Sequence, residues 1–313
     1  MPIKAAASLQ NIPLAGQNKM AVVVGGTRGI GGGVARLLAK IGCSRIIILG
    51  RNEKQGREAV EVLKKLAPNS RNIATEFIKG DLSDNKGINA VAVSLLEIAG
   101  DTGIDYLILC QNGSPTALTM KDNADGHDTA FTIQCISRFA LAYTLTTRNG
   151  LAPNATVISI CNQGQSLDDL SVDDLSLKRR LAARPSAPAL FMQQSKRDST
   201  VLDSCFEELN LRYPQYRYYS LFPGLVRSED FDPNFFPGYL KWAAIKLVGI
   251  SPDEYAYYPV YILASPDAQR TLGSGRYFGR RLDPTQLGKW SQDPKNRQVM
   301  WEKMTEIINI GKH

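Results

Sequence analysis

The stretch that decides the fold is Met20-Ala-Val-Val-Val24, followed directly by Gly25-Gly26-Thr27-Arg28-Gly29-Ile30-Gly31. The first five residues are apolar and rich in valine, which is typical of a buried β-strand. Apolar residues then recur at helical spacing, at Val34, Leu37, Leu38 and Ile41. A glycine-rich turn between a strand and a helix lets the backbone approach a pyrophosphate, whose charge is favoured by the helix N-terminus. We therefore interpret the turn as a phosphate cradle, with a plain tight turn as the alternative.

The rest of the chain continues this alternation of strands and helices. Further strands are predicted at Arg45–Leu49, Ile73–Ile78, Tyr106–Cys110, Thr156–Ile160 and Arg217–Leu221. Helices are predicted at Glu53–Leu66, 86–99, 128–147 and 189–211. Alternating strands and helices form a parallel sheet, and strands that are apolar throughout are covered on both faces. The sequence thus predicts an α/β fold, a doubly wound parallel sheet (Rossmann fold), in a single domain over residues 19–280.

Four segments lie outside this minimal plan. Residues 1–18 are predicted to be an irregular leader, and residues 281–313 a C-terminal extension with an amphipathic helix at Val299–Ile310. Residues 163–186 are a long polar connection, and residues 228–250 carry many aromatic and apolar side chains. Because long connections in compact domains often act as lids, we expect both to border the substrate. For residues 228–250, a dimer contact or a membrane contact is the alternative to a lid.

Composition excludes several classes of protein. The chain has 313 residues, of which 43% are hydrophobic and 21% charged, the mixture of a globular protein and not of a disordered or fibrous one. No run approaches the ~20 apolar residues of a membrane helix, and the start lacks the apolar stretch of a secretory signal. Five widely spaced cysteines and only two histidines indicate no disulfide framework, no metal site and a reducing, cytoplasmic setting.

The net charge of the chain and the residues at the end of the second predicted strand indicate which molecule it binds. The net charge of +7 is mild, and the basic clusters lack interleaved aromatic residues, so we expect no nucleic acid partner. The second strand ends in Leu49-Gly50-Arg51-Asn52, without the carboxylate that binds the ribose 2′-hydroxyl of NAD. Arg51 there, and Arg28 in the glycine turn, can accommodate the 2′-phosphate of NADP. NADP(H) is the expected cofactor, and two ordinary surface arginines are the alternative.

With these residues in place, the chain from about residue 19 to about residue 280 resembles the short-chain dehydrogenase/reductase family. The glycine turn is similar to the family's T-G-x-x-x-G-x-G, with Val24 in place of the threonine. Gly80-Asp81-Leu82 looks like its adenine-contacting Asp-Leu, and Phe222-Pro223-Gly224-Leu225-Val226-Arg227-Ser228 like the segment that borders the nicotinamide. The resemblance implies cofactor contacts from Gly25, Thr27, Arg28, Gly29, Ile30, Gly31, Arg51, Asn52, Asp81, Leu82, Gln111, Asn112, Lys196, Pro223, Gly224 and Val226.

Three shorter stretches look like fungal biosynthetic members of the family. They are Asp105-Tyr-Leu-Ile-Leu-Cys-Gln-Asn112, Ser137-Arg138-Phe139 and Val172-Asp-Asp-Leu-Ser-Leu177. Such members act in secondary metabolism or resemble retinol-type dehydrogenases, which implies an apolar, natural-product-like substrate. Family members also pair through the helices predicted at 128–147 and 189–211, so a homodimer or homotetramer is expected by analogy.

The catalytic positions depart from the family pattern of Asn, Ser, Tyr and Lys, in which the last two are spaced Tyr-x-x-x-Lys. Ser195-Lys196 matches the end of that motif, which implies that Lys196 holds the nicotinamide ribose, but four residues earlier stands Met192. Cys161-Asn162 stand where the family's serine follows its strand, and Gln134 stands at the structural asparagine. The resemblance therefore implies a non-standard site around Lys196, Asn162, Cys161 and Gln134.

Met192 cannot donate the proton that a ketone needs as it is reduced, and losing a general acid costs ~10²–10⁴ in rate. Three alternatives stay open. Another group is the acid: Cys161, His127, or a tyrosine of the Tyr255, Tyr257, Tyr258 cluster folded over the site. The substrate is an iminium, which needs no acid. The cofactor is bound but not consumed, and the pocket steers a cyclisation or isomerisation by holding one conformer.

The expected function is an NADP(H)-dependent oxidoreductase that reduces an imine, iminium or carbonyl group of an apolar biosynthetic intermediate. Asn162, Cys161 and Gln111 are expected to line its reacting face. A non-redox isomerase or cyclase with NADP bound is the alternative, and a catalytically silent binding protein is a third hypothesis.

Overall fold

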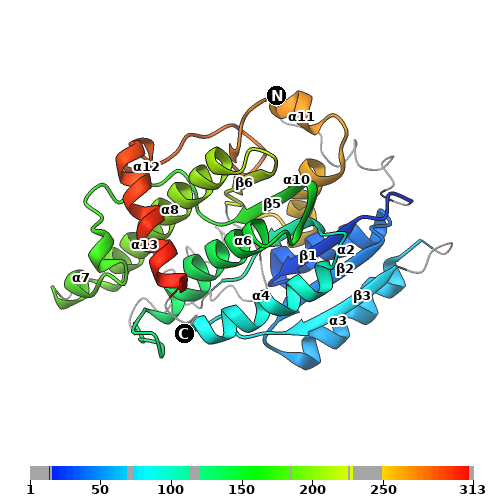
Figure 1. Ribbon diagram of the computed structural model, residues 1–313, viewed down its shortest axis with the longest axis horizontal. Helices are drawn as coiled ribbons and strands as arrows, with labels where there is room; N and C mark the ends of the chain where they lie inside the picture. The colour runs from blue at the N-terminus through cyan, green and yellow to red at the C-terminus, as the bar shows by residue number, and fades with distance from the viewer. Residues whose placement is uncertain are drawn as a thin grey trace.

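The structure, a computed structural model, describes residues 14, 16–68, 73–112, 120–183, 185–224, 226–227 and 249–309. A seven-stranded parallel sheet runs through its centre in the order β3-β2-β1-β4-β5-β6-β7 (Figure 1). The strands are β1 (Met20–Val24), β2 (Arg45–Gly50), β3 (Ala74–Lys79), β4 (Ile104–Leu109), β5 (Leu151–Ile160), β6 (Arg217–Leu221) and β7 (Tyr277–Phe278). The strand order reverses between β1 and β4, and in such sheets ligands bind outside the carboxyl ends of the strands at that point.

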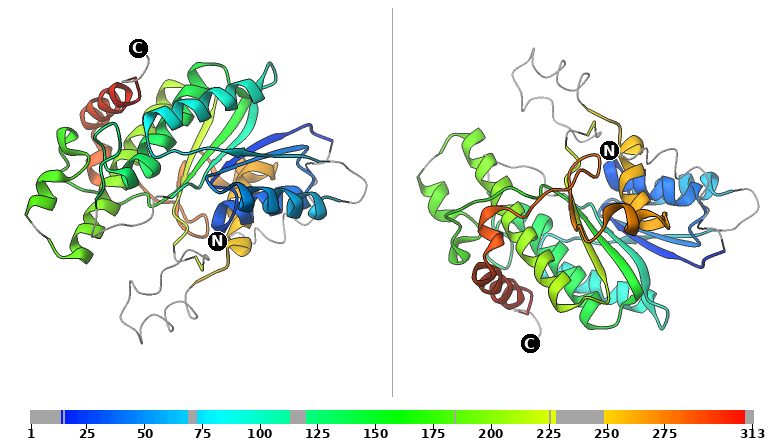
Figure 2. Two further views of the ribbon diagram at one scale, coloured as in Figure 1. Left: turned by 90° about the horizontal axis from the view of Figure 1, so that it is seen from below. Right: turned by 90° about the horizontal axis from the view of Figure 1, so that it is seen from above.

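Helices cover both faces of the sheet (Figure 2). One face carries α2 (Gly29–Lys40), α3 (Glu53–Leu66), α10 (Pro252–Ala264) and α11 (Ala268–Leu272). The other carries α4 (Asn85–Ala99), α6 (Ser137–Thr147), α8 (Ala187–Arg212) and α13 (Pro294–Asn309). Short helices complete the connections: α5 (Thr129–Phe131), the π-helix η1 (Thr132–Ile136), η2 (Val172–Asp174), α7 (Lys178–Ala182) and α12 (Lys289–Gln292).

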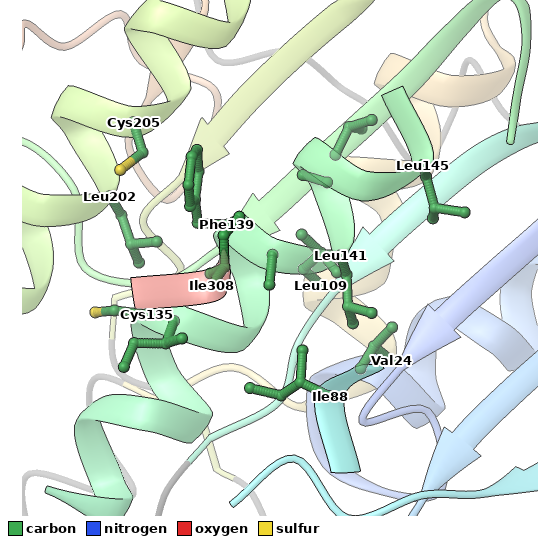
Figure 3. Packing of buried hydrophobic residues seen from close by; sticks show 14 of the residues in the cluster. Val24, Ile88, Leu109, Cys135, Phe139, Leu141, Leu145, Leu202, Cys205 and Ile308 are labelled. Carbon is green, nitrogen blue, oxygen red and sulfur yellow. The ribbon is translucent and has the colours of Figure 1, made fainter. Parts of the chain in front are cut away.

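The sheet separates two hydrophobic clusters. Along β1, Val22 and Val24 belong to the cluster under α4, α6 and α8, whereas Ala21 and Val23 belong to the cluster under α2 and α10. Figure 3 shows part of the first cluster, in which Val24 lies close to Ile88 of α4. Successive strand residues point to opposite faces, so a strand buried on both faces is apolar throughout.

The predicted single α/β domain with a doubly wound parallel sheet is confirmed, and each strand from β1 to β6 overlaps a predicted one. The strand β7 and the helix α10 were not predicted from the sequence. A Cβ at Gly33 of α2 would lie only 2.5 Å from the carbonyl oxygen of Pro252, so α10 packs on α2 at a distance that requires glycine. The leader also contributes to the core, because Leu14 is buried and its N–H donates to the Ile41 carbonyl at 2.8 Å.

The C-terminal extension packs on the face of α6 and α8. Trp301 of α13 stacks edge-on against Phe139 and Tyr143 of α6, and the Arg212 guanidinium lies 4.6 Å from the centre of its ring. The helix thus covers part of the surface through which pairing is expected by analogy, and the oligomeric state stays a prediction. Among the described residues, no helix is both long and apolar enough to span a membrane.

Candidate functional site

The turn between β1 and α2 requires glycine at two positions. Gly25 has φ +74°, and a Cβ there would lie 2.9 Å from the amide nitrogen of Gln111. A Cβ at Gly31 would lie 2.3 Å from the carbonyl oxygen of Gly25. Because α2 begins at Gly29, the first N–H groups of this helix lie beside the turn without intrahelical partners. The glycine cradle and the helix N-terminus therefore fit a dinucleotide pyrophosphate.

The predicted 2′-phosphate residues separate into two places. Arg28 is the exposed N-cap of α2, and it lines a surface pocket of about 270 Å³ between α2 and α3 together with Thr27, Arg36, Gln55 and Glu58. Arg51 is exposed after β2 and does not line this pocket. Arg36, which sequence reasoning missed, donates from Nε to Asp253 of α10 at 2.8 Å. The side chain of Asn52 caps α3 by accepting the Gln55 N–H at 3.1 Å, so Asn52 has a structural role.

Two further predicted cofactor contacts lie after β3, and two after β4. Asp81 is exposed and accepts the Ser83 N–H at 3.0 Å, whereas the side chain of Leu82 is buried in the core. Gln111 is buried, with its side-chain amide donating to Ser137 Oγ at 3.0 Å and its backbone against Gly25. Asn112 is exposed. The structure thus joins Gln111 to the glycine turn and leaves Asp81 and Asn112 accessible to a ligand.

The segment after β6 carries the remaining predicted cofactor contacts. Gly224 has φ +64°, and a Cβ there would lie 3.1 Å from Cδ of Arg280, which packs along it. Val226 is buried and forms an isolated parallel bridge with Ile250. Pro223 is half-buried. Residues 228–248, most of the predicted lid, lie outside the described residues.

Asn162 is fixed between the loop after β5 and helix α8. Its Nδ2 donates to Ser195 Oγ, and its Oδ1 accepts a hydrogen bond of 3.2 Å from the side-chain amide of Gln165. Lys196 follows Ser195 and is half-buried, and its ammonium group makes no ion pair with any residue that the structure describes. An unpaired lysine beside an oriented amide can hold a ribose hydroxyl and polarise an oxygen.

Met192 stands one helical turn before Lys196, at the position that the family resemblance assigns to tyrosine. Residues four apart on a helix are neighbours on one face. Met192 is 48% exposed, so the described residues leave about half of it accessible. A thioether has no proton to give, so this face of α8 holds a lysine without a neighbouring acid.

Gln134 and Cys161 are brought together, but away from Ser195. Gln134 lies in the π-helix η1, a helical form that often marks functional sites, and its Nε2 donates to Cys161 Sγ at 2.9 Å. Cys161 packs against the core cluster under α6 and α8, and burial raises the pKa of its thiol. The structure therefore places Cys161 in the layer between the sheet and η1, where its thiol accepts from Gln134 and is also reached by the backbone N–H of Asn162.

The other predicted acids do not lie over the site. Tyr255 is 1% exposed in the cluster under α2 and α10, with its pKa raised by burial, and Tyr257 and Tyr258 pack against the same cluster. Tyr255 is therefore a core side chain of α10 and not an acid over the site, whereas Tyr257 and Tyr258 are half-buried. The pKa of His127 is lowered by burial, and the charged neighbours that act on it are acidic and lysine side chains outside the predicted site.

Sequence reasoning missed a set of polar residues on α8 that holds the loop after β5. Ser199 Oγ accepts the Gln165 N–H at 2.9 Å, and Thr200 Oγ1 accepts the Leu167 N–H at 3.0 Å. Asp203 Oδ2 accepts the N–H groups of Gly164 at 2.9 Å and of Gly288 at 3.2 Å. Small polar residues recurring on one face of an otherwise buried helix were the available signal. These hydrogen bonds hold the loop after β5, which contains Asn162, against α8 and the C-terminal extension.

Asp203 makes the stability of these loop contacts depend on pH. Burial raises its pKa from 3.8 to about 7, against the two backbone donors, so its folded-state pKa exceeds that of the unfolded chain. Its contribution to stability is therefore complete below about pH 4 and is lost as the pH rises through about 7. We expect the unfolding free energy of the wild type, relative to Asp203→Asn, to fall by roughly 3 kcal/mol between about pH 5 and about pH 8.

Denaturant unfolding of both proteins across this pH range measures that difference. Asparagine keeps an oxygen for the two N–H donors but does not titrate, so it is the matched variant. A difference between the two proteins that stays constant with pH would show that Asp203 is ionised throughout.

Comparison with known proteins agrees with this geometry. The family model for short chain dehydrogenase matches residues 19–163. Human polyprenol dehydrogenase is 23% identical over 302 residues, covering 94% of this chain and 86% of the relative. An oxidoreductase of Emericella nidulans is 25% identical over 255 residues, covering 79% of this chain and 72% of the relative.

Solved structures share the fold at low sequence identity. A short-chain dehydrogenase/reductase from Mycobacterium ulcerans superposes with a TM-score of 0.61 at 15% identity, over 92% of this chain and 98% of that one. A Burkholderia cenocepacia short chain dehydrogenase in complex with NADP gives 0.57 at 17% identity, over 88% and 98%. The MalC reductase/Diels-Alderase of Malbranchea aurantiaca gives 0.56 at 19% identity, over 79% and 90%. The chain therefore has the fold of the short-chain dehydrogenases/reductases, its residues 19–163 match the model for short chain dehydrogenase, and its relatives include proteins named as dehydrogenases and oxidoreductases, fungal ones included.

Proposed function

We propose that the chain is an NADP(H)-dependent oxidoreductase that works without the family's tyrosine, on an apolar intermediate of natural-product biosynthesis. The observation that carries the proposal is the face of α8, where Lys196 is unpaired among the described residues, Asn162 contacts Ser195, and Met192 stands one turn before the lysine. The glycine cradle supplies the binding site for a dinucleotide. A substrate that needs no proton as it is reduced, such as an iminium, suits this site best.

The choice of NADP(H) is supported by charge at the carboxyl edge of the sheet. Arg51 directly follows β2, Arg28 is the N-cap residue of α2, and no carboxylate occupies the tip of β2. A structural neighbour was solved in complex with NADP. The apolar substrate is supported by a human relative named for a polyprenol. Fungal relatives named as oxidoreductases support the class of reaction.

In this proposal the nicotinamide, when bound, supplies the hydride. The chain's residues bind and orient. The turn at Gly25 and the N-terminus of α2 bind the pyrophosphate, and Lys196 holds the ribose. Asn162 is oriented by Ser195 and Gln165, and the second N–H of its Nδ2 donates toward the reacting group. No side chain of this face delivers a proton, so the rate depends on positioning and on charge.

The cofactor assignment is tested by Arg51→Ala and Arg28→Ala. Each substitution is expected to weaken NADPH binding by about tenfold to a hundredfold and to leave NADH binding nearly unchanged, because only NADPH has the 2′-phosphate. Calorimetric titration with both dinucleotides measures the two affinities. Arg57→Ala removes an exposed arginine of α3 that is paired with Glu53, and is the matched control. Equal losses for NADPH and NADH would contradict the assignment.

A second candidate, a non-redox cyclase or isomerase, is favoured by the absence of an acid at Met192 and by the structural neighbour named as a reductase/Diels-Alderase. The two functions differ in stoichiometry. With candidate substrates, the oxidoreductase consumes one NADPH for each product, and the cyclase forms product while the absorbance of the reduced nicotinamide stays constant.

A further inference from the structure

Arg138 is a buried cation at the carboxyl edge of the sheet. It lies on α6 with 0% exposure, and its Nη2 donates to the Gln111 carbonyl at 2.7 Å. Its Nη1 donates to the Leu109 carbonyl and, at 3.1 Å, to Ser159 Oγ. The guanidinium therefore spans the ends of β4 and β5, directly behind the residues that adjoin the glycine turn.

The charge of Arg138 is not neutralised locally. Among the described residues, no carboxylate lies within 4.0 Å of its guanidinium, and its Nε is buried without a partner. The other deeply buried arginines differ: Arg197 is paired with Asp198 at 2.6 Å, and Arg297 with Glu208 at 3.1 Å. Arginine stays protonated in proteins, and a buried charge is costly unless it is both paired and hydrogen-bonded. Arg138 is hydrogen-bonded to two carbonyls but is not paired.

The field of Arg138 reaches the ends of both strands. Burial raises the pKa of the Cys110 thiol to about 12, and the Arg138 charge acts in the opposite direction. Burial also raises the pKa of the Cys161 thiol, and the Arg138 charge again acts to lower it. Asp198, whose negative charge also reaches Cys161, is held by Arg197. The Arg138 charge thus acts on groups at the ends of both strands.

Resting on the proposed nicotinamide site, we propose that Arg138 makes the site bind the reduced cofactor more tightly than the oxidised one. The oxidised nicotinamide ring carries a positive charge and the reduced ring is neutral, while the phosphates of the two forms are the same. A buried cation behind β4 and β5 repels the oxidised ring and leaves the reduced ring unaffected. Lys196 contributes with the same sign, but it is half-buried and better screened.

The test compares dissociation constants for NADPH and NADP⁺. The wild type is expected to bind NADPH about tenfold more tightly, and Arg138→Met to lose most of that preference. Arg138→Lys keeps the charge and is expected to keep the ratio. Arg297→Met, which removes a buried arginine of α13 that is paired with Glu208 of α8, is expected to leave the ratio unchanged. A purely structural role for Arg138 weakens both nucleotides alike and does not move the ratio.

Three results separate the possibilities. If the wild type binds both forms equally, or if Arg138→Met keeps the wild-type ratio, the inference is overturned. If the wild type binds neither nucleotide, the proposed function fails instead. Circular dichroism identifies a variant that does not fold. If Arg138→Met does not fold, it is replaced by Arg138→Gln, which is neutral but can donate two hydrogen bonds. If neither variant folds, the ratio of the wild-type dissociation constants for NADPH and NADP⁺ decides whether the inference stands.

Discussion

Met192→Tyr is expected to raise the rate of reduction of small aldehydes and ketones by about a hundredfold or more over the wild type. The substitution places a phenol one helical turn before Lys196, on the face of α8 that Asn162 adjoins through Ser195. The exposed side chain at this position leaves room for the larger ring, so we expect little cost in stability. Consumption of NADPH with a panel of carbonyl compounds measures the gain.

The physical reason is the proton that a developing alkoxide needs. A positioned general acid contributes ~10²–10⁴ in rate, and a phenol near an ammonium group gives up its proton more readily than a free phenol. Lys196, unpaired within the described residues, is the neighbour that lowers the pKa of the new phenol. Reduction of an iminium is expected not to gain, because it forms a neutral amine without an acid.

Met192→Phe separates the hydroxyl from the ring. It has the same bulk as the tyrosine variant and no proton, so its carbonyl activity is expected to equal that of the wild type. Lys196→Ala in the tyrosine variant is expected to remove most of the gain. If the phenylalanine and tyrosine variants are equally active, the chain already has an acid elsewhere, and the proposal of a site without one is wrong.

The sheet could be predicted because local patterns determine it. The run Met20–Val24 and the glycines after it specify β1 and the turn without help from distant residues, and the apolar strands follow from burial on both faces. Helix α10 had its own signal, since Ser251 and Glu254 form a capping box around Pro252. Pro259 inside the same helix breaks the ordinary pattern.

The site was harder to predict because its contacts join residues far apart in the chain. Asn162 and Ser195 are separated by 33 positions, and Asp203 and Gly288 by 85. Whether Cys161 faces the substrate or the core depends on the π-helix that brings Gln134 to it, and no residue pattern indicates that irregular turn. The buried charge of Arg138 was likewise hidden, since an arginine in sequence is more often a surface residue.

Gly31→Ala is expected to abolish NADPH binding, with a loss of about a hundredfold or more. The added methyl would lie 2.3 Å from the carbonyl oxygen of Gly25, a backbone atom that cannot swing aside. Relief requires the turn and the start of α2 to separate, which moves the N–H groups that face the phosphates. Calorimetric titration with NADPH, beside a thermal melt, distinguishes lost binding from lost folding.

The neighbouring glycine provides the control. A Cβ at Gly32 would lie 3.2 Å from Nη1 of Arg36, the far end of a flexible side chain, and 3.5 Å from the backbone of Thr27. Gly32→Ala therefore keeps the turn, and alanine favours the helix interior by about 1 kcal/mol, so this variant is expected to bind NADPH normally and melt no lower than the wild type. If Gly31→Ala also binds NADPH normally, the phosphates of the dinucleotide do not lie against this turn. Only a ligand that contacts the Gly25 carbonyl and the first turn of α2 would bind differently to the two variants, because the two replaced glycines are adjacent.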